Sequence, residues 1–429
     1  MFPRWHVHHV LGLVLLALAS SAPAQSRLSF FRHYAAQPGA LARRQFLLAE
    51  MPRLAPVEQV FARQLLASTD AELGRYRQAL EDFPFDQREL PTIALPMPRT
   101  LPTVERIDYR DFVDPRRVAD ALPAAPAIAQ AATGRRLVLI NEAHHDAHTR
   151  ELVLQLLPRL RALGFDHFAA EALTEDGKTL AQRGYPLVSS GTEYLHEPLY
   201  GEIVREAIRL GYTLVPYDPT DPAPDRDLAQ AENLYQRVFA HNPSARLFAL
   251  VGYAHLDKAP GELGPVTPMA MRLKALTGIE PLSIDQTMFR EIRPEPPHSI
   301  YRWVAAAWPS HTPVVLQVQG EDALWSADPK RHDISVILPP AYGRKRPDWL
   351  TLGGTRHAYP ITTALCANHL PCLVEARHAD ESADAVAADR YAFFQAPANS
   401  RLYLHPGGYQ LRASDAAGRT LGTWSINVK

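Results

Sequence analysis

The sequence has few cysteines and no excess of charge of one sign. Cys366 and Cys372 are the only cysteines among 429 residues, and the formal net charge is −1 with a pI near 7.0. A protein that binds nucleic acid or an anionic membrane surface usually carries a basic patch. No block of Lys or Arg stands out here. We therefore expect neither a nucleic acid nor a membrane surface as partner.

The two cysteines lie six positions apart, in CANHLPC. Two thiols alone make an incomplete metal site, and a redox pair usually has the spacing C-x-x-C. In an oxidising compartment, two nearby thiols most simply form a local bridge. We predict a Cys366–Cys372 disulfide, with free thiols as the alternative.

Long apolar runs are also rare, with one exception at the N-terminus. Arg4 precedes the apolar run VLGLVLLALA at 10–19, and the small residues at 20–24 end in an A-x-A pattern. This arrangement is typical of a signal peptide that is cleaved after Ala24. Spanning a bilayer needs about 20 apolar residues, which disfavours the alternative of a retained anchor. We expect a periplasmic or secreted protein without a membrane span.

The spacing of apolar residues indicates an α/β protein with flanking parts. Within 131–300, short apolar runs at 135–140, 165–170, 212–217 and 246–251 alternate with amphipathic segments that end at glycines. Strands that alternate with helices form βαβ units, which predict a parallel sheet with helices on both faces.

The remaining segments follow other patterns. We predict a helical N-terminal segment at 25–90, a Pro-rich linker and lead-in segment at 91–130, a mixed extension of the core at 301–356, and a small β-sandwich-like all-β domain at 357–429. Within the first of these, GRYRQALEDFP is typical of a helical hairpin.

Carboxylates and imidazoles follow four successive predicted strands. The residues are Glu142, His144 and His145 after the first strand, Glu171 after the second, Tyr217 and Asp218 at the end of the third, and Tyr253 and His255 after the fourth. Taken singly, each has an ordinary structural alternative as a helix cap or a loop charge. Because ligands bind at the carboxyl ends of parallel strands, the set together predicts a site for acid–base chemistry or for an open metal centre.

These residues also resemble a known family. LVLINEAHHDAHTRELVLQLLPRLRALGFDHFAAEAL resembles the opening of the erythromycin-esterase-like and ChaN-like proteins, which are related to the TIKI/TraB hydrolases. Their pattern is a strand, then G-E-x-H or G-E-x-x-H, then Glu after the next strand. RDLAQAEN is similar to their R-[DE]-x-x-M-A-x-N helix, and LFALVGYAHL contains their G-x-x-H motif.

This chain departs from the family pattern at two positions. Asn141 stands in place of the first Gly, and Gln230 stands in place of Met. Asn tolerates a left-handed backbone better than most residues, so we expect the bend at Asn141 to survive. His144 fits the TIKI and ChaN spacing, whereas His145 fits the esterase spacing.

The resemblance implies roles for individual residues. Glu142, His144 or His145, Glu171 and His255 would form the catalytic centre. If a divalent metal (Mn, Zn or Co) is present, His144, Glu171 and His255 would hold it. Arg226 and Asp227 would orient groups or contact the substrate. Tyr217, Asp218 and Tyr253 are further candidates for substrate contact because of their place at the ends of the predicted strands, independently of the resemblance. The polar excursion at 172–197 would form a lid, or else an ordinary surface loop.

The leading hypothesis is a hydrolase of ester or amide bonds in a small-molecule or peptide substrate. The alternatives are a haem- or iron-binding protein of the ChaN-like type, with Tyr253 and His255 as ligands, and a non-catalytic scaffold. The N-terminal helices or the C-terminal β domain would then contact a protein partner. We expect Glu142 and His255 to lie at the mouth of the sheet, so that replacing either with Ala abolishes hydrolysis without unfolding the protein.

Overall fold

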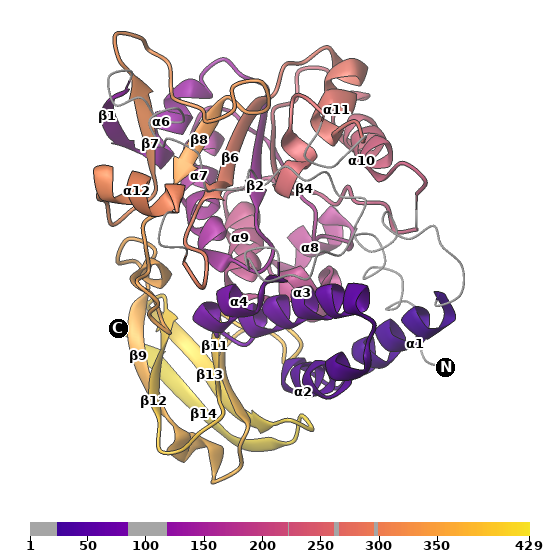
Figure 1. Ribbon diagram of the computed structural model, residues 1–429, viewed down its shortest axis with the longest axis vertical. Coiled ribbons are helices and arrows are strands. Elements are labelled where there is room, and N and C mark those ends of the chain that lie inside the picture. The colour runs from indigo at the N-terminus through magenta and orange to yellow at the C-terminus, as the bar shows by residue number, and fades with distance from the viewer. Residues whose placement is uncertain (1–23, 85–117, 222, 261–265, 296–298) are drawn as a thin grey trace.

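The computed structural model describes residues 24–84, 118–221, 223–260, 266–295 and 299–429. The signal peptide predicted for 1–24 therefore lies outside the described residues apart from Ala24, as does the part of the predicted linker before 118. Figure 1 shows an α/β body, a layer of N-terminal helices beside it, and a β domain at the C-terminal end of the chain. Within the described residues, no helix combines the length and apolarity that a membrane span requires.

An eight-stranded sheet forms the body, in the order β1-β7-β8-β6-β2-β5-β3-β4. The strands β8, β6, β2, β5, β3 and β4 run parallel, whereas β7 is antiparallel to both of its neighbours. Their bounds are β1 Val118–Pro123, β2 Leu137–Glu142, β3 His167–Ala170, β4 Thr213–Val215, β5 Leu247–Gly252, β6 Leu282–Phe289, β7 Val314–Val318 and β8 Ile334–Ile337.

Helices cover both faces of this sheet, as predicted. Successive strand residues point to opposite faces, so Val138 and Ile140 pack in one hydrophobic cluster and Leu137 and Leu139 in another. The first cluster includes residues of α6, α7 and α9, and the second includes residues of α10 and α11. The bounds are α6 Ala124–Ala131, α7 Glu151–Ala162, α9 Pro198–Arg209, α10 Arg226–Leu234 and α11 Met269–Thr277. The predicted fold class is confirmed.

The N-terminal segment is helical, as expected. It contains α1 Ala24–Ala35, α2 Ala40–Glu50, α3 Pro56–Glu72 and α4 Tyr76–Asp82. α3 and α4 form the hairpin that GRYRQALEDFP predicts. Gly74 makes the turn between them at φ 70°, in the left-handed region that favours glycine.

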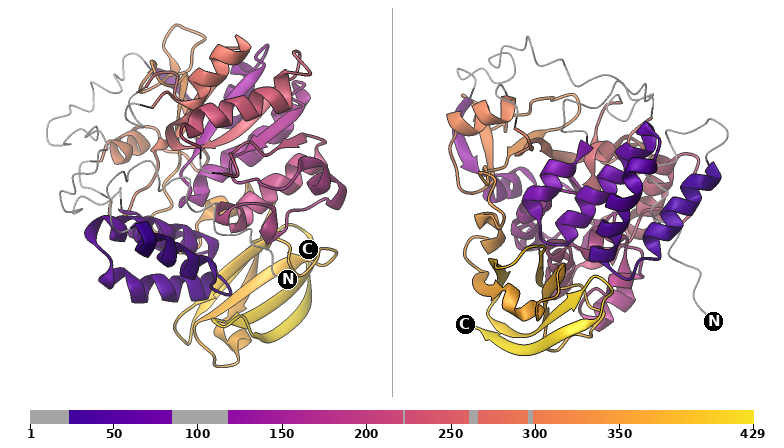
Figure 2. Two further views of the ribbon diagram at one scale, coloured as in Figure 1. Left: turned by 90° about the vertical axis from the view of Figure 1, so that its right-hand side faces the viewer. Right: turned by 60° about the horizontal axis from the view of Figure 1, so that its bottom comes forward.

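Two antiparallel sheets form the C-terminal domain, with a hydrophobic cluster drawn from both. One has the order β11-β10-β13-β14 and the other pairs β12 with β9. The bounds are β9 His357–Thr362, β10 Cys372–His378, β11 Asp389–Phe393, β12 Asn399–Leu404, β13 Gly407–Asp415 and β14 Thr420–Val428. Cys366 and Cys372 form the expected disulfide, and both are buried. Figure 2 shows this domain beside the N-terminal helices.

The sheet extends further along the chain than the apolar runs predict. β1 and α6 lie within 118–131, where the sequence predicts a linker and lead-in segment. β1 pairs with β7, with Leu122 opposite Val315, and a pairing so distant in sequence leaves no local signal. β7, β8 and α12 Ile300–Ala307 show that 301–356 completes the sheet.

Candidate functional site

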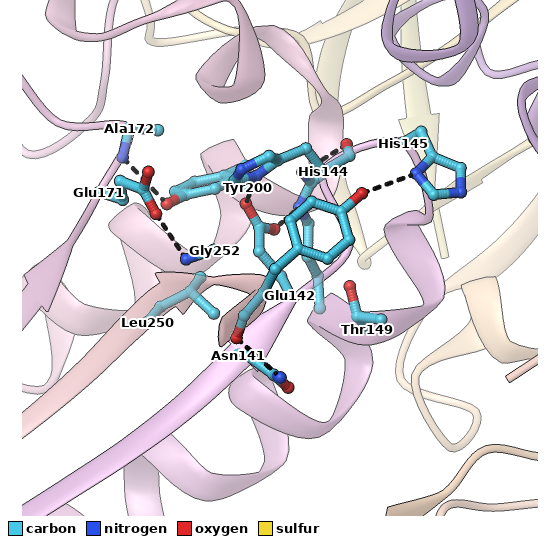
Figure 3. Close-up of polar contacts among 12 residues, drawn as sticks. Asn141, Glu142, His144, His145, Thr149, Glu171, Ala172, Tyr200, Leu250 and Gly252 are labelled. Atoms are coloured by element: carbon cyan, nitrogen blue, oxygen red, sulfur yellow. Dashed lines mark hydrogen bonds and ion pairs between the residues drawn. The ribbon is translucent and has the colours of Figure 1, made fainter. Parts of the chain in front are cut away.

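Glu142 and His144 form a hydrogen-bonded pair at the end of β2. His144 Nδ1 lies 2.9 Å from Glu142 Oε1, and Arg150 Nε donates to Glu142 Oε2 at 2.8 Å (Figure 3). Burial by itself raises the pKa of Glu142, but Arg150 and His144 outweigh burial and lower the pKa. Glu142 is therefore a carboxylate that accepts the Nδ1 proton of His144, which leaves the lone pair of the ring on Nε2.

Arg150 is fully buried and shared between two carboxylates. Its Nη1 donates to Glu197 Oε2 at 2.9 Å, and its Nη2 donates to the His144 carbonyl at 3.1 Å. Glu197 also caps the N-terminus of α9, where its carboxylate accepts from two backbone N–H groups. Arg150 thereby holds both the Glu142 carboxylate and the backbone carbonyl of His144 in place.

Glu171 follows β3 and belongs to a second charged group. Its Oε1 accepts from Arg226 Nη2, and its Oε2 accepts from the Gly252 backbone N–H, each at 2.5 Å. Burial raises the pKa of Glu171, but Arg226, His255 and His144 outweigh burial and lower it to about 2. The carboxylate is therefore ionised at neutral pH.

Gly252 lies between the two groups. A Cβ on Gly252 would come within 2.7 Å of His144 Nε2 and within 2.8 Å of Glu171 Oε2. Because these contacts are shorter than a real Cβ tolerates, only glycine fits between the two side chains. His144 Nε2 and Glu171 thus approach the same point at the carboxyl end of β5 (Figure 3).

Arg226 begins α10 and joins Glu171 to a second imidazole. Its guanidinium donates to Asp218 at 2.9 Å, and its Nη1 lies 3.1 Å from His255 Nε2. His255 Nδ1 lies 2.8 Å from Asp227 Oδ1. Two carboxylate–imidazole pairs, Glu142–His144 and Asp227–His255, therefore flank Glu171 and Arg226.

Opposing influences act on His255. Burial lowers the pKa of His255, the carboxylates of Asp227 and Glu171 raise it, and the Arg226 guanidinium lowers it. The carboxylates prevail, so the pKa lies above its usual value. The ring can therefore hold a proton at a higher pH than an ordinary histidine.

Aromatic rings cover both adjacent histidines. Tyr194 stacks on His144 with ring centroids 4.0 Å apart, and Phe83 stacks on His145 at 3.5 Å. Tyr253 places its hydroxyl 3.2 Å from His145 Nδ1. The site is closed in this structure.

The structure separates the sequence-predicted residues into two sets. Those brought together are Glu142, His144, Glu171, Asp218, Arg226, Asp227 and His255. His145 faces Phe83 and Tyr253 instead. Tyr217 packs in the hydrophobic core, and its hydroxyl donates to the Leu250 carbonyl at 3.4 Å. Its hydroxyl is near enough to Glu171 and Asp218 that, after burial, these carboxylates raise its pKa.

Two expectations about local structure were wrong. Asn141 lies inside β2, where its amide donates to Asp285 at 2.8 Å, and the left-handed residue is Tyr253 at φ 38°. Glu142 and His255 are 1% and 7% exposed, so they are buried and do not lie at an open mouth of the sheet. The reason is that β2 runs on through Glu142 and aromatic side chains of other segments cover its end.

The arrangement does not fit a metal held by His144, Glu171 and His255. Both Glu171 oxygens accept hydrogen bonds, and His255 Nε2 faces a guanidinium, so a fixed organic cation lies where the ion would bind. Across the residues that the structure describes, no group of three or more His, Cys, Asp or Glu side chains is placed to hold a metal. Both ring nitrogens of His255 contact protein partners, Arg226 and Asp227.

Sequence reasoning missed several residues of this site. They are Phe83, Arg150, Tyr194, Glu197 and Gly252 as a spacer. Arg150 follows the histidine-rich motif closely, so its charge beside Glu142 was a usable signal. Phe83 and Tyr194 come from distant segments and carry no local signal.

Comparisons with known proteins give little beyond distant structural likeness. No protein-family model and no curated protein matches the chain. The type III effector HopBA1 is 16% identical, with a TM-score of 0.28 over 44% of this chain and 96% of that one. A structure described as "Bacterial protein toxins" is 19% identical, with a TM-score of 0.29 over 53% of this chain and 47% of that one. Scores this low carry no argument about function, and the resemblance to erythromycin-esterase-like proteins stays a prediction.

Proposed function

We propose that this protein is an exported hydrolase of ester or amide bonds. The observation that carries the proposal is the Glu142–His144 pair, in which a buried carboxylate accepts a hydrogen bond from Nδ1–H and so directs Nε2, the proposed base, toward Gly252 and Glu171. A carboxylate that fixes the tautomer of a catalytic imidazole is a recurrent device of hydrolases. The family resemblance supports the same reaction class.

The proposed reaction begins with a water molecule at His144. Nε2 removes a proton from this water, and the oxygen forms a bond to the substrate carbonyl carbon. Arg226 supplies positive charge for the oxyanion that develops on the carbonyl oxygen. The bond from carbon to the leaving oxygen or nitrogen then breaks, and the leaving group takes up a proton. The products are a carboxylic acid and an alcohol or amine.

His255 is the proposed proton donor to the leaving group, and its Nε2 has to turn from the Arg226 guanidinium to deliver the proton. Although burial opposes the charged form, hydrogen bonding to Asp227 raises the pKa of His255, so the ring holds a proton near neutral pH more readily than an ordinary histidine. Glu171 orients Arg226 by accepting one of its N–H groups. These roles assign the base and the acid to different imidazoles, whose carboxylate partners come from different elements.

Export is part of the proposal. It rests on the apolar run and the small-residue cleavage pattern of 1–24. The Cys366–Cys372 disulfide is compatible with an oxidising compartment.

Adjacent histidines provide a matched test of the proposed base. We expect His144→Gln to lower kcat about 10²–10⁴-fold, because the base acts on the water only in the transition state. His145→Gln should keep kcat within about tenfold, since His145 faces Phe83 and Tyr253. Both variants are assayed on aryl esters and macrolide lactones, with melting temperatures as a folding control.

Two outcomes would contradict the assignment. A larger loss in His145→Gln than in His144→Gln would transfer the role of the base to His145. If the wild type turns over no ester, lactone or amide, the proposal that this protein is a hydrolase is contradicted.

A further inference from the structure

The N-terminal helical segment reaches the candidate site through one ring. Phe83, one residue beyond the end of α4, stacks on His145 at 3.5 Å with an interplanar angle of 8°. It also lies nearly parallel to Tyr253, with centroids 6.5 Å apart. Phe83 is 8% exposed, so its ring is enclosed at the surface where the helical segment meets the α/β body.

Polar contacts anchor this segment beside the site. The Tyr76 hydroxyl of α4 donates to Glu197 Oε1 at 2.8 Å, and Glu197 in turn holds Arg150. Glu72 of α3 lies 3.6 Å from His196 Nδ1. Both contacts are made at the end of the 172–197 excursion, so the position of Phe83 is coupled to the same segment that carries Tyr194.

Tyr194 covers the other histidine from a more firmly held position. Thr192 donates its backbone N–H to the Ala172 carbonyl at 2.8 Å, and Leu173 bridges to Gly191. Phe83 instead has an extended backbone, with ψ 119°, immediately after its helix. The two covering rings therefore come from differently built segments, a loop held by backbone hydrogen bonds for Tyr194 and the end of a helix for Phe83.

We propose that Phe83 controls access to the candidate site from the side of His145, and thereby determines the size of the substrates that enter. The access half of this proposal stands on the stacking geometry alone, whereas the specificity half rests on the proposed hydrolase function. A flat ring seated on an imidazole excludes any group that must approach that face of the imidazole. Removing the ring should expose His145 and admit bulkier substrates.

A chemical reagent tests access without any substrate. Diethyl pyrocarbonate carbethoxylates unprotonated imidazole nitrogens, and peptide mass spectrometry locates the modified residue. In Phe83→Ala, we expect the modification rate of His145 to rise at least about tenfold, because less local opening is then needed to expose it, and the rate of His144, which Tyr194 covers, to rise less. The control is Phe31→Ala in the same helical segment, since Phe31 is 4% exposed and packs against Phe30. It should leave both rates at the wild-type value.

Equal rates in the wild type and in folded Phe83→Ala would overturn the proposal. If Phe83→Ala does not fold, Phe83→Leu decides instead, because Leu keeps apolar bulk but lacks a flat face that covers the imidazole. An unchanged rate in folded Phe83→Leu would then overturn the proposal, and a raised rate would support it.

Kinetics separate this proposal from the hydrolase proposal. In Phe83→Ala we expect the ratio of kcat/KM for a bulky aryl ester to that for the matching acetate ester to increase, with no such increase in Phe31→Ala. If Phe83→Ala turns over both esters but the ratio of their kcat/KM values is unchanged, Phe83 does not determine substrate size. If the wild type turns over no substrate, the hydrolase proposal fails while the reagent measurement still decides the access half.

Discussion

At the scale of single residues, Arg226 determines what the charged cluster can do. An arginine guanidinium keeps its charge at every physiological pH, and this one contacts Glu171, Asp218 and His255. It therefore balances two carboxylates and reduces the tendency of His255 to become charged. Where the sequence allows a metal ion held by His144, Glu171 and His255, the folded chain places the Arg226 guanidinium beside Glu171 and His255.

Glu171 should make stability depend on pH in the acid range. Its pKa is about 2 in the folded protein and 4.5 without its partners, so the folded state favours the ionised form. The stabilisation is therefore complete above about pH 4.5 and is lost as the pH falls toward 2. We expect the difference in urea midpoint between the wild type and Glu171→Gln to shrink as the pH is lowered from 6 to about 3.

The comparison isolates one carboxyl group, because glutamine keeps its size and removes its ionisation. A midpoint difference that stays constant over this range would show that Glu171 has no depressed pKa. The Arg226 contact would then contribute no pH-dependent stability.

At the scale of elements, the register of β2 and β5 brings the two motifs together. Glu142 pairs with Gly252 across these parallel strands, so the end of one motif lies beside the end of the other. Gly252 then separates His144 from Glu171 and donates its N–H to the Glu171 carboxylate. Gly252, the glycine of the G-x-x-H motif, therefore leaves the space in which the side chains of His144 and Glu171 approach each other.

Gly252→Ala should impair catalysis. The added Cβ would lie within 2.8 Å of His144 and Glu171, so one of these side chains must shift. A displacement of about 1 Å in a catalytic group costs about 10² in rate, and we expect kcat to fall by at least that factor. Steady-state kinetics on the best ester substrate measures the loss.

Gly408→Ala is the matched control for this prediction. Gly408 also lies in a strand, and a Cβ there would meet Ala379 at an ordinary 3.6 Å. Wild-type kinetics in Gly252→Ala would mean that the close packing around this glycine has no role in turnover.

At the scale of the whole molecule, the N-terminal helices join the α/β body to the C-terminal β domain. Arg390 of β11 donates to Glu72 of α3 at 3.2 Å, and the Ala392 N–H donates to the Leu73 carbonyl at 3.1 Å. The same hairpin holds Phe83 over His145. The N-terminal segment predicted as a candidate partner-binding surface thus packs against its own chain on two sides.

The turn at Gly74 should be sensitive to the smallest added side chain. A Cβ there would lie 2.0 Å from the Arg390 carbonyl oxygen, and the φ of 70° disfavours any residue with a side chain. We expect Gly74→Ala to lower the free energy of unfolding by more than about 3 kcal/mol, since steric overlap with backbone adds to the left-handed penalty of about 1–2 kcal/mol. Urea unfolding followed by circular dichroism measures this loss.

Gly134→Ala separates the two contributions. Gly134 has a similar φ of 77°, but a Cβ there would have no neighbour within 4 Å. We expect Gly134→Ala to lower the free energy of unfolding by only the left-handed penalty of about 1–2 kcal/mol. Equal losses in the two variants would mean that the contact between Gly74 and Arg390 contributes nothing to the docking of the β domain.

The sequence determined the fold class and the location of the charged residues, because both follow from local patterns. Apolar runs such as LVLI identify buried strands. The carboxyl ends of parallel strands meet at one edge, so the order of residues along the chain is enough to place Glu142, Glu171 and His255 near one another.

Tertiary structure alone decided how those residues act together. The contact of Arg226 with Glu171, the approach of His144 Nε2 to Gly252, and the stacking of Phe83 on His145 all depend on side-chain directions and on contacts between distant segments. The strand β1 likewise forms because the neighbouring strand β7, distant in sequence, pairs with it at the edge of the sheet. Local periodicity carries no information about such partners, since their contact energies arise only when the chain has folded.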